Sequence, residues 1–317
     1  MLDKLDRAIL VELDKNSRQS FSKIAQRVKT SKNVVSYRIN QLISKNIING
    51  FYAVIDTVKL GYYNHRVYLK LKNCNEKQRS EIVRAFVNDP GTWWVAKTSY
   101  PWDIAIIILA RNMHEANARY IAVAGKFQQY ISKYQLNSYI QLIHFPKDYL
   151  VDQPWTGERQ SFVLGEETAT KITEMEYRIL RILSTNARIG TIALAKKLKT
   201  TPMVVKYAIK KLIKQGVIGG FRVLLDYEKI GYEYYWIHMN VSANSNEIKK
   251  FVSSFRNTAY TDETLGGDTI EFAVHIKKEE SIQGIIDILL EQFGEFVSDY
   301  YYFRVIKNEK VIYMPHK

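Results

Sequence analysis

The feature that most constrains how this chain can fold is an internal repeat. When the 317-residue sequence is compared with itself at a shift of 170 positions, residues 5–62 align with residues 175–232 without a gap, and 21 of the 58 pairs are identical. Beyond this stretch the two halves match more loosely. A repeat of this length predicts two copies of one unit of roughly 145 residues, joined by a connecting segment.

The positive charge of the chain lies within the two best-matched segments. The chain has 46 Lys and Arg against 32 Asp and Glu, a formal net charge of +14. Residues 1–60 carry +6 and residues 171–230 carry +9, whereas the remainder has a net charge of −1. A lysine-rich surface with no particular partner would spread this excess along the chain. Its position therefore predicts a polyanionic partner for these two segments.

Each basic segment has the apolar spacing of three short helices. In the first copy the stripes fall in residues 6–13, in residues 22–28 and after Ser31, a candidate N-cap. In the second copy Thr201 is the candidate N-cap and Pro202 takes the first helical position. The very short turn before each third helix is typical of a helix-turn-helix, and the extended residues 50–56 suit a wing. The buried faces of the third helices are predicted to be Val34, Val35, Ile39, Leu42 and Ile43, and Val204, Val205, Ile209, Leu212 and Ile213.

The opposite face of each third helix is the candidate DNA-binding surface. Arginine, asparagine and glutamine can read base edges, whereas lysine mainly neutralises phosphate, so we expect the first copy to specify sequence and the second to grip the backbone. A charged helix face can also be merely solvated, and the two tyrosines can instead pack against a neighbouring helix. The candidates are Ser31, Lys32, Asn33, Ser36, Tyr37, Arg38 and Gln41, and Thr201, Lys206, Tyr207, Lys210, Lys211 and Lys214.

Several classes of protein do not fit the sequence. The single cysteine, Cys74, excludes a disulfide framework and a cysteine-based zinc site. No apolar run approaches the roughly 20 residues of a membrane span, and the N-terminus lacks a signal-peptide pattern. The six histidines are scattered, and no Walker loop, nucleophile elbow, metalloprotease motif or dinucleotide fingerprint occurs. We therefore expect a cytoplasmic protein without a membrane partner, a metal, another cofactor or catalytic residues.

About 60 residues of the first copy carry a recognisable family pattern. It comprises Ile24-Ala25-Gln26-Arg27-Val28, then Ser31, then Val35-x-x-Arg38-Ile39-x-x-Leu42 and Ile47-Ile48-Asn49-Gly50-Phe51. This pattern resembles the opening of the Lrp/AsnC (feast/famine) transcriptional regulators. The second copy is similar but degenerate, because Glu176 stands where Asp6 does and Ala208 replaces Arg38.

The resemblance implies an α+β fold class, with two winged helix-turn-helix domains and two ferredoxin-like βαββαβ (RAM-type) domains in tandem. The expected domains are residues 1–60, 61–146, 171–230 and 231–317, with residues 147–170 as a linker. The local patterns permit the ferredoxin-like domains. Strands are expected at residues 65–72, 93–99, 103–109 and 137–145, and at 234–241, 259–265, 269–276 and 296–306; helices are expected at 76–87, 115–133, 246–255 and 280–293.

In this family a glycine-containing turn after the second strand of the ferredoxin-like domain helps to form an amino-acid effector site. The second copy has Leu265-Gly266-Gly267-Asp268 there, whereas the first has Tyr100-Pro101-Trp102-Asp103, without a glycine. An ordinary hairpin turn would also explain the Gly-Asp pair. The candidate effector-binding residues are Tyr100, Trp102, Asp103, Gly266, Gly267 and Asp268.

The resulting prediction is a DNA-binding regulator whose two halves pair within one chain as a pseudo-dimer on double-stranded DNA, alone or within a higher homo-oligomer. Two alternatives stay open. Siroheme decarboxylases share the Lrp-like architecture, but their pattern has a His-Asn-Tyr stretch where this chain has residues 93–97 and 260–263 without a histidine. An architectural protein could keep the fold and bind nucleic acid without choosing a sequence.

Overall fold

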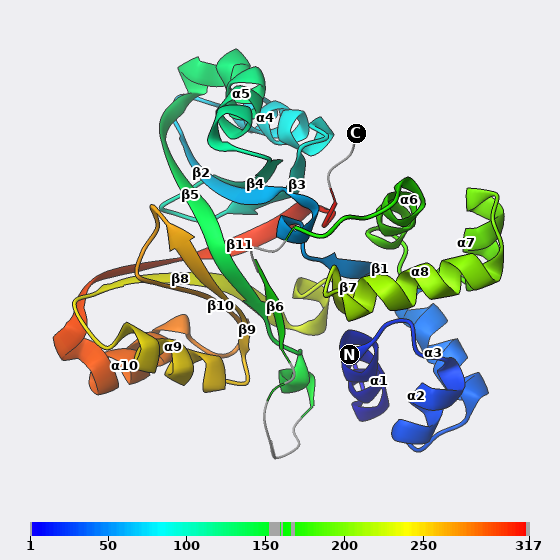
Figure 1. Ribbon diagram of the computed structural model, residues 1–317. Coiled ribbons are helices and arrows are strands. Elements are labelled where there is room, and N and C mark those ends of the chain that lie inside the picture. The colour runs from blue at the N-terminus through cyan, green and yellow to red at the C-terminus, as the bar shows by residue number, and fades with distance from the viewer. Residues whose placement is uncertain (1, 152–158, 160, 166–168, 315–317) are drawn as a thin grey trace. The chain divides into compact units, whose positions relative to one another are not determined.

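The computed structural model describes residues 2–151, 159, 161–165 and 169–314. The chain divides into two compact units (Figure 1). Unit 1 comprises residues 1–56, 145–162 and 170–232, and unit 2 comprises residues 57–144, 163–169 and 233–317. The contacts therefore group the helix-turn-helix segments of both repeats in unit 1 and the ferredoxin-like segments of both repeats in unit 2.

Unit 1 contains two triplets of helices, and most of the helices begin at a capping side chain. Asp3, Ser20 and Ser31 each accept a hydrogen bond from the backbone three residues on, and Thr173 and Thr201 do the same in the second triplet. Such caps satisfy amide groups that would otherwise lack a partner at the helix start. The helices are α1 (Lys4–Lys15), α2 (Phe21–Arg27), α3 (Lys32–Ser44), α6 (Glu174–Leu183), α7 (Thr191–Leu198) and α8 (Pro202–Lys214).

The predicted buried faces of α3 and α8 are correct at their centres and wrong at their edges. Val35, Ile39 and Leu42 are buried in α3, as are Val205, Ile209 and Leu212 in α8. Only the residues that point directly at the first two helices of each triplet fit into its small core. The outer members of both stripes are exposed: Val34, Ile43, Val204 and Ile213.

The two triplets meet through reciprocal contacts. Strands β1 (Ile48–Ile55) and β7 (Ile218–Leu225) pair antiparallel. Arg18 donates to the backbone oxygens of residues 187 and 189, and Arg188 donates in the same way to those of residues 17 and 19. Because the two arginines are equivalent in the repeat, the exchange has the form of a twofold-symmetric dimer contact made within one chain.

Part of the expected linker is built into unit 1. Lys147 and the 3-10 turn η3 (Asp148–Leu150) follow the last strand of the first repeat. Lys147 is buried, and its Nζ lies 2.6 Å from Asp14, which also binds Arg222 at 2.7 Å. These two cations outweigh the cost of burial and lower the pKa of Asp14. Residues 152–158, 160 and 166–168 of the expected linker lie outside the described residues.

Unit 2 contains two ferredoxin-like halves. The first consists of β2 (Tyr63–Leu71), α4 (Glu76–Asn88), β3 (Thr92–Thr98), β4 (Ile104–Ala110), α5 (Met113–Ala124) and β5 (Ile131–His144). The second consists of β8 (Tyr232–Val241), α9 (Ser245–Ser254), β9 (Thr258–Leu265), β10 (Ile270–Lys277), α10 (Ile282–Phe293) and β11 (Val297–Val311). Between the halves, β6 (Phe162–Leu164) adds to the edge of β5.

The prediction of one helix over residues 115–133 is wrong. A 3-10 turn, η2 (Gly125–Tyr130), follows α5, and β5 begins at Ile131.

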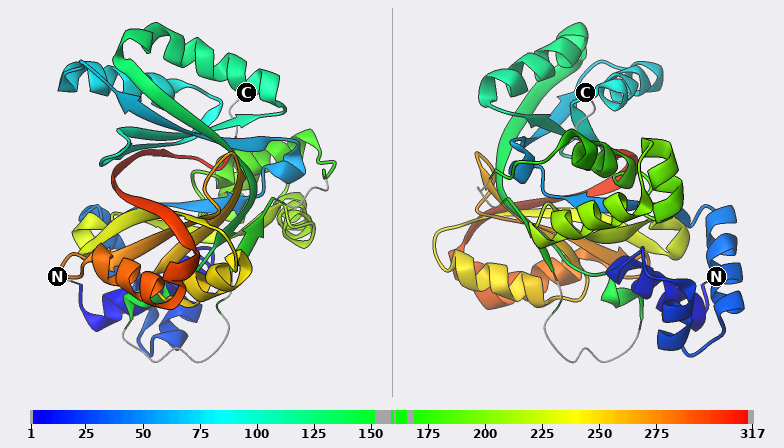
Figure 2. Two further views of the ribbon diagram at one scale, coloured as in Figure 1. Left: turned by 90° about the vertical axis from the view of Figure 1, so that its left-hand side faces the viewer. Right: turned by 45° about the vertical axis from the view of Figure 1, so that its right-hand side comes forward.

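The strand pairings of unit 2 close on themselves. The order is β2-β4-β3-β11-β8-β10-β9-β5, and β5 also pairs with β2. The second strand of each half thus pairs with the last strand of the other, as β3 with β11 and β9 with β5. Figure 2 shows α4 and α5 on one side of the strands and α9 and α10 on the opposite side.

The side chains of unit 2 sort by strand face, because successive residues of a strand point to opposite sides. Val67 and Leu69 of β2 pack into an apolar core with α4 and α5, and Ile237 and Met239 of β8 pack likewise with α9 and α10. The alternate residues face the interior between the two half-sheets.

The α+β fold class with two winged helix-turn-helix and two ferredoxin-like domains is confirmed. None of the helices in the described ranges is both long and apolar enough to cross a membrane.

Candidate nucleic-acid interface and buried polar cluster

The third helices α3 and α8 present most of the predicted DNA-binding residues to solvent. Ser31 and Thr201 cap the two helices by accepting from the backbone of Val34 and Val204. Tyr37 and Tyr207 are 60% and 72% exposed, so neither is packed against a neighbouring helix. The remaining exposed candidates are Lys32 and Asn33 on α3 and Lys206, Lys210 and Lys214 on α8, while Ser36 is half-buried.

Three other candidates are engaged by contacts within unit 1. The guanidinium of Arg38 forms ion pairs with Asp3 at 2.6 Å and Asp6 at 3.2 Å. Lys211 forms an ion pair with Glu176 at 2.7 Å, and Gln41 donates a hydrogen bond of 2.6 Å to the hydroxyl of Tyr37. Arg38 and Lys211 thus tie each third helix to the first helix of its triplet. Both would have to exchange these partners before they could contact DNA.

One exposed residue of this surface was not predicted from the sequence. Asn40 is exposed and lies seven residues after Asn33, which places both amides on the same side of α3. Its counterpart in the repeat is Lys210, which was selected. Helical periodicity alone would have found Asn40, because it follows Asn33 and Tyr37 at the spacing of one helix face.

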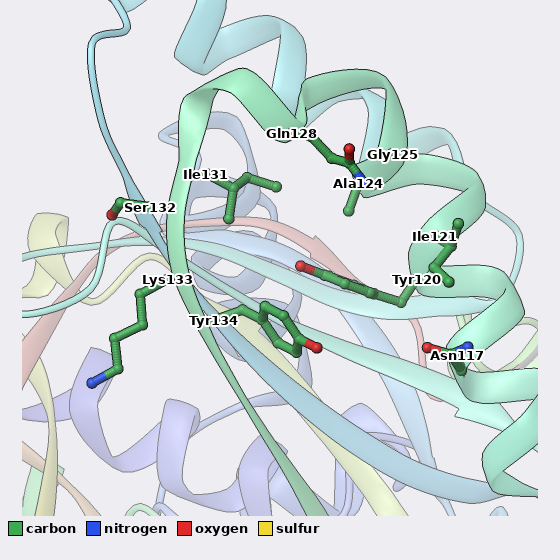
Figure 3. A pocket seen from close by; sticks show the side chains of 10 residues that line it. All are labelled: Asn117, Tyr120, Ile121, Ala124, Gly125, Gln128, Ile131, Ser132, Lys133 and Tyr134. Carbon is green, nitrogen blue, oxygen red and sulfur yellow. The ribbon is translucent and has the colours of Figure 1, made fainter.

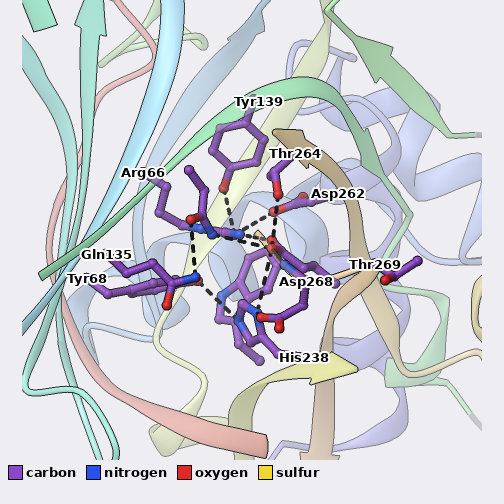
Figure 4. Close-up of polar contacts among 12 residues, drawn as sticks. Arg66, Tyr68, Gln135, Tyr139, His238, Asp262, Thr264, Asp268 and Thr269 are labelled. Carbon is purple, nitrogen blue, oxygen red and sulfur yellow. Dashed lines mark hydrogen bonds and ion pairs between the residues drawn. The ribbon is translucent and has the colours of Figure 1, made fainter. Parts of the chain in front are cut away.

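A second candidate site is a buried polar cluster in unit 2, centred on Arg66 of β2 (Figure 4). Arg66 and the side chains of its two carboxylate partners, Asp262 and Glu271, are fully buried. The guanidinium lies 2.6 Å from Asp262 and donates to the hydroxyl of Tyr139 at 3.0 Å. It also lies over the rings of Tyr68, Tyr139 and Trp236 at 4.9–5.0 Å. Burial raises the pKa of Asp262 to about 6 even beside Arg66.

His238 of β8 extends the cluster across the repeat. Its Nδ1 lies 3.0 Å from Asp268, and its Nε2 lies 3.2 Å from the hydroxyl of Tyr68, the residue equivalent to His238 in the first repeat. Burial lowers the pKa of His238 to about 4, so the ring is neutral at pH 7. A neutral ring that donates from Nδ1 to Asp268 and accepts at Nε2 from Tyr68 fits both contacts.

Only some of the six candidate effector residues lie at the polar cluster. Asp268 also accepts hydrogen bonds from Asn240 and Tyr301, and Trp102 stacks on Tyr68 at 5.5 Å, so one residue of each turn reaches the cluster. Gly267 packs so closely against Glu271 that a side chain there would collide, and Gly266 adopts a positive φ of 85°. Asp103 instead pairs with Lys70 and Arg79, and Tyr100 is exposed.

Arg66, Tyr68, His238, Asp262 and Glu271 were not predicted from the sequence to belong to a site. The available signal was an ionisable side chain inside an apolar strand, such as Glu271 between Ile270 and Phe272. Ligand atoms of His238, Asp268 and Glu271 lie within 4.8 Å of one another, as in a divalent cation site. Here, however, these groups bind one another, Arg66 and nearby donors, so the arrangement acts as an internal ion-pair network.

Unit 2 also has a pocket of about 410 Å³ between α5, η2 and the start of β5 (Figure 3). Tyr120 and Tyr134 line it together with Ala124 and Ile131. Burial raises the pKa of Tyr120 to about 12. In the second half the last residue of α10 is Phe293 rather than alanine, and it packs against Phe251. Polar side chains such as Asn117 and Gln128 complete the lining, so the pocket suits a small molecule that carries both apolar and polar groups.

Comparisons with known proteins agree with this architecture. A family model described as "Winged helix-turn-helix DNA-binding" matches residues 2–49 and 172–218. The HTH-type transcriptional regulator LysM of Sulfurisphaera tokodaii is 31% identical over 116 residues, which cover 37% of this chain and 83% of the relative. The HTH-type transcriptional regulator Rv2324 of Mycobacterium tuberculosis is 28% identical over 117 residues, which cover 37% of this chain and 78% of the relative.

Among solved structures, the siroheme decarboxylase NirDL matches 99% of this chain and 94% of its own, with a TM-score of 0.62 and 15% sequence identity. At that identity the match shows that the fold is shared over nearly the whole of both chains. The relatives, the two helix-turn-helix matches and the fold lead to one assignment. The chain belongs to the Lrp/AsnC family of helix-turn-helix transcriptional regulators, with the elements of that family present twice.

Proposed function

We propose that the protein is a sequence-specific regulator that binds double-stranded DNA as an intramolecular pseudo-dimer. The observation that carries the proposal is the composition of unit 1: two capped third helices, each with an exposed polar face, in the segments that hold the positive charge of the chain. A DNA partner would place the protein in the cytoplasm. Two recognition helices of one pseudo-dimer would address major-groove faces about 34 Å apart, or a multiple of that distance.

The two helices are proposed to contribute unequally. The exposed amides Asn33 and Asn40 on α3 can pair with adenine, whereas Lys206, Lys210 and Lys214 on α8 suit phosphate. The bound site would then be an imperfect palindrome with unequal half-sites. Each lysine that contacts phosphate adds about one unit to the slope of binding against salt concentration.

Selection of bound duplexes from random DNA tests the proposal. Recovery of one imperfect palindrome supports it, and equal binding of all sequences would favour the architectural alternative. In the matched variants, Asn33→Ala should relax base preference in one half-site. Lys210→Ala should weaken all duplexes similarly and flatten the salt slope by about one unit.

We further propose that a small molecule such as an amino acid tunes DNA binding through unit 2. The Gly266–Asp268 turn at the polar cluster and the pocket beside Tyr120 are the two candidate sites. Melting temperatures measured with each of the twenty amino acids at millimolar concentration test this proposal, and no shift with any of them would remove it. If a shift occurs, Ala124→Phe should abolish binding in the pocket and leave binding at the turn unchanged.

A second candidate function comes from the likeness over the whole chain to the siroheme decarboxylase NirDL. The buried His238 and the half-buried Asp268 have the geometry of a histidine oriented by a carboxylate. Both ring nitrogens already have partners, however, and this favours a structural role. Absorbance spectra and product analysis after siroheme addition test the enzyme, and turnover would support it.

A further inference from the structure

The recognition helices α3 and α8 carry different side chains at equivalent backbone positions. α3 and α8 each begin one residue after a capping side chain and each run for 13 residues, so residues 33 and 203 are both the second residue of their helix. Residues near the start of a recognition helix are those that contact base edges. Asn33 and Met203 therefore occupy equivalent reading positions.

At this position α3 offers an amide and α8 offers an apolar side chain. Asn33 is exposed, and an amide can pair with the N6 and N7 atoms of adenine. Met203 is 80% exposed, although a thioether has only a weak acceptor to offer a base edge. Tyr207 follows one turn later and is also exposed, so Met203 and Tyr207 lie on the same face of α8 as Lys206 and Lys210.

Within the major groove, the C5-methyl group of thymine is the apolar feature of the base edges. A flexible methionine on the same helix face as lysines that can hold the phosphates is suited to cover such methyl groups. We propose that Met203 gives α8 a preference for thymine, so that the half-site under α8 is read by methyl contact while the half-site under α3 is read by amide hydrogen bonds. This inference rests on the proposed function, because it requires that unit 1 binds duplex DNA.

Deoxyuridine provides a direct test, since it pairs like thymidine but lacks the methyl group. The full chain is titrated with its best selected duplex and with duplexes in which each thymine is replaced singly by deoxyuridine. We expect that one or two replacements, all in the same half-site, weaken binding about fourfold each, as burial of one methyl group implies. Met203→Ala should bind the unmodified duplex about fourfold more weakly and should no longer respond to those replacements.

Asn33→Ala is the matched control at the equivalent position of the other helix. It should remain sensitive to deoxyuridine in the α8 half-site. In the other half-site the wild-type protein should lose affinity when an adenine is replaced by 7-deazaadenine, and Asn33→Ala should not. Both side chains are exposed, so neither substitution should change the melting temperature, and this is measured first.

The outcomes separate the inference from the proposed function. The inference is overturned if the wild-type protein binds a selected duplex but tolerates every deoxyuridine, or if Met203→Ala keeps the full deoxyuridine response. In either case the proposed function as a sequence-specific regulator stands. If no duplex is bound at all, the proposed function is overturned and the inference with it.

Discussion

Replacing Arg66 by methionine should destabilise unit 2 strongly, because the substitution leaves two buried carboxylates without their cation. Arg66 pairs with Asp262 and Glu271, and all three side chains are fully buried. Methionine replaces the aliphatic stem of Arg66 but not its guanidinium, so the loss combines the missing charge with the contacts that the guanidinium makes to neighbouring rings. Removing one partner from a buried ion pair costs about 3–5 kcal/mol. Lys307→Met is the matched control: its ion pair with Glu309 is solvent-exposed on the lysine side, so the loss should stay below about 1 kcal/mol.

The penalty at Arg66 should depend on pH in a defined direction. Burial already holds the pKa of Asp262 at about 6 with Arg66 present, and removal of the cation raises it further. At pH 5 the carboxyl of the variant is therefore protonated, and it no longer carries an uncompensated charge. The difference in unfolding free energy between wild type and Arg66→Met should consequently be smaller at pH 5 than at pH 7.5.

Urea unfolding of the full chain, followed by tryptophan fluorescence, measures this effect. Trp236 lies over Arg66 and Trp102 stacks on Tyr68, so both report on the cluster. A triple variant that adds Asp262→Asn and Glu271→Gln removes the orphaned charges and should recover part of the loss. A penalty at Arg66 no larger than that of Lys307→Met, or one that grows as the pH falls, would refute the reasoning.

Three further predictions concern other contacts. Gly267→Ala should destabilise unit 2 by about 1–3 kcal/mol, because its Cβ collides with Glu271; urea midpoints check this against Gly284→Ala in α10, where the added Cβ meets open space and should be tolerated. Arg18→Ala and Arg188→Ala should lower the stability of unit 1 by similar amounts, about 1–2 kcal/mol each, and clearly unequal losses would contradict the twofold exchange. His238→Gln should reduce the acid sensitivity of folding. Burial lowers the pKa of His238 to about 4, so folding favours the neutral ring. The resulting contribution to the free energy of unfolding, about 3 kcal/mol in all, is fully present above pH 6.5 and is lost as the pH falls towards 4. Urea titrations at pH 7 and 4.5 check this, and an unchanged acid loss in the variant would contradict it.

Much of unit 1 was predictable because its signals are local. A cap such as Ser31 and an apolar spacing such as Val35, Ile39 and Leu42 lie within one helix, so short-range sequence specifies both. The exposed edges of the stripes, such as Ile43, were mispredicted because the sequence of one helix does not determine how much of its apolar face the neighbouring helices cover. The overlong helix predicted at residues 115–133 failed for a similar reason: pairing with β2 holds the segment from Ile131 onward as a strand.

The buried cluster could not be predicted, because its residues are distant in sequence. Arg66 and Asp262 are 196 residues apart, and they meet only when the last strand of each half pairs with the second strand of the other. Periodicity places Arg66 on one face of its strand but does not say which strand will lie opposite. The candidate turns were selected from the family resemblance, and two of their residues, Trp102 and Asp268, reach the cluster.

By itself, the sequence determined that the chain is a duplication, that its positive charge belongs to two helix-turn-helix segments, and that each third helix is capped and amphipathic. These properties depend on residue spacing and composition, which can be counted along the chain. Tertiary structure alone decided that Arg38 and Lys211 pair with carboxylates of the first helices, that Arg18 and Arg188 exchange contacts, and that a cation and two carboxylates share the interior of unit 2. The reason is physical: the partners of a charged group are fixed by packing between remote segments.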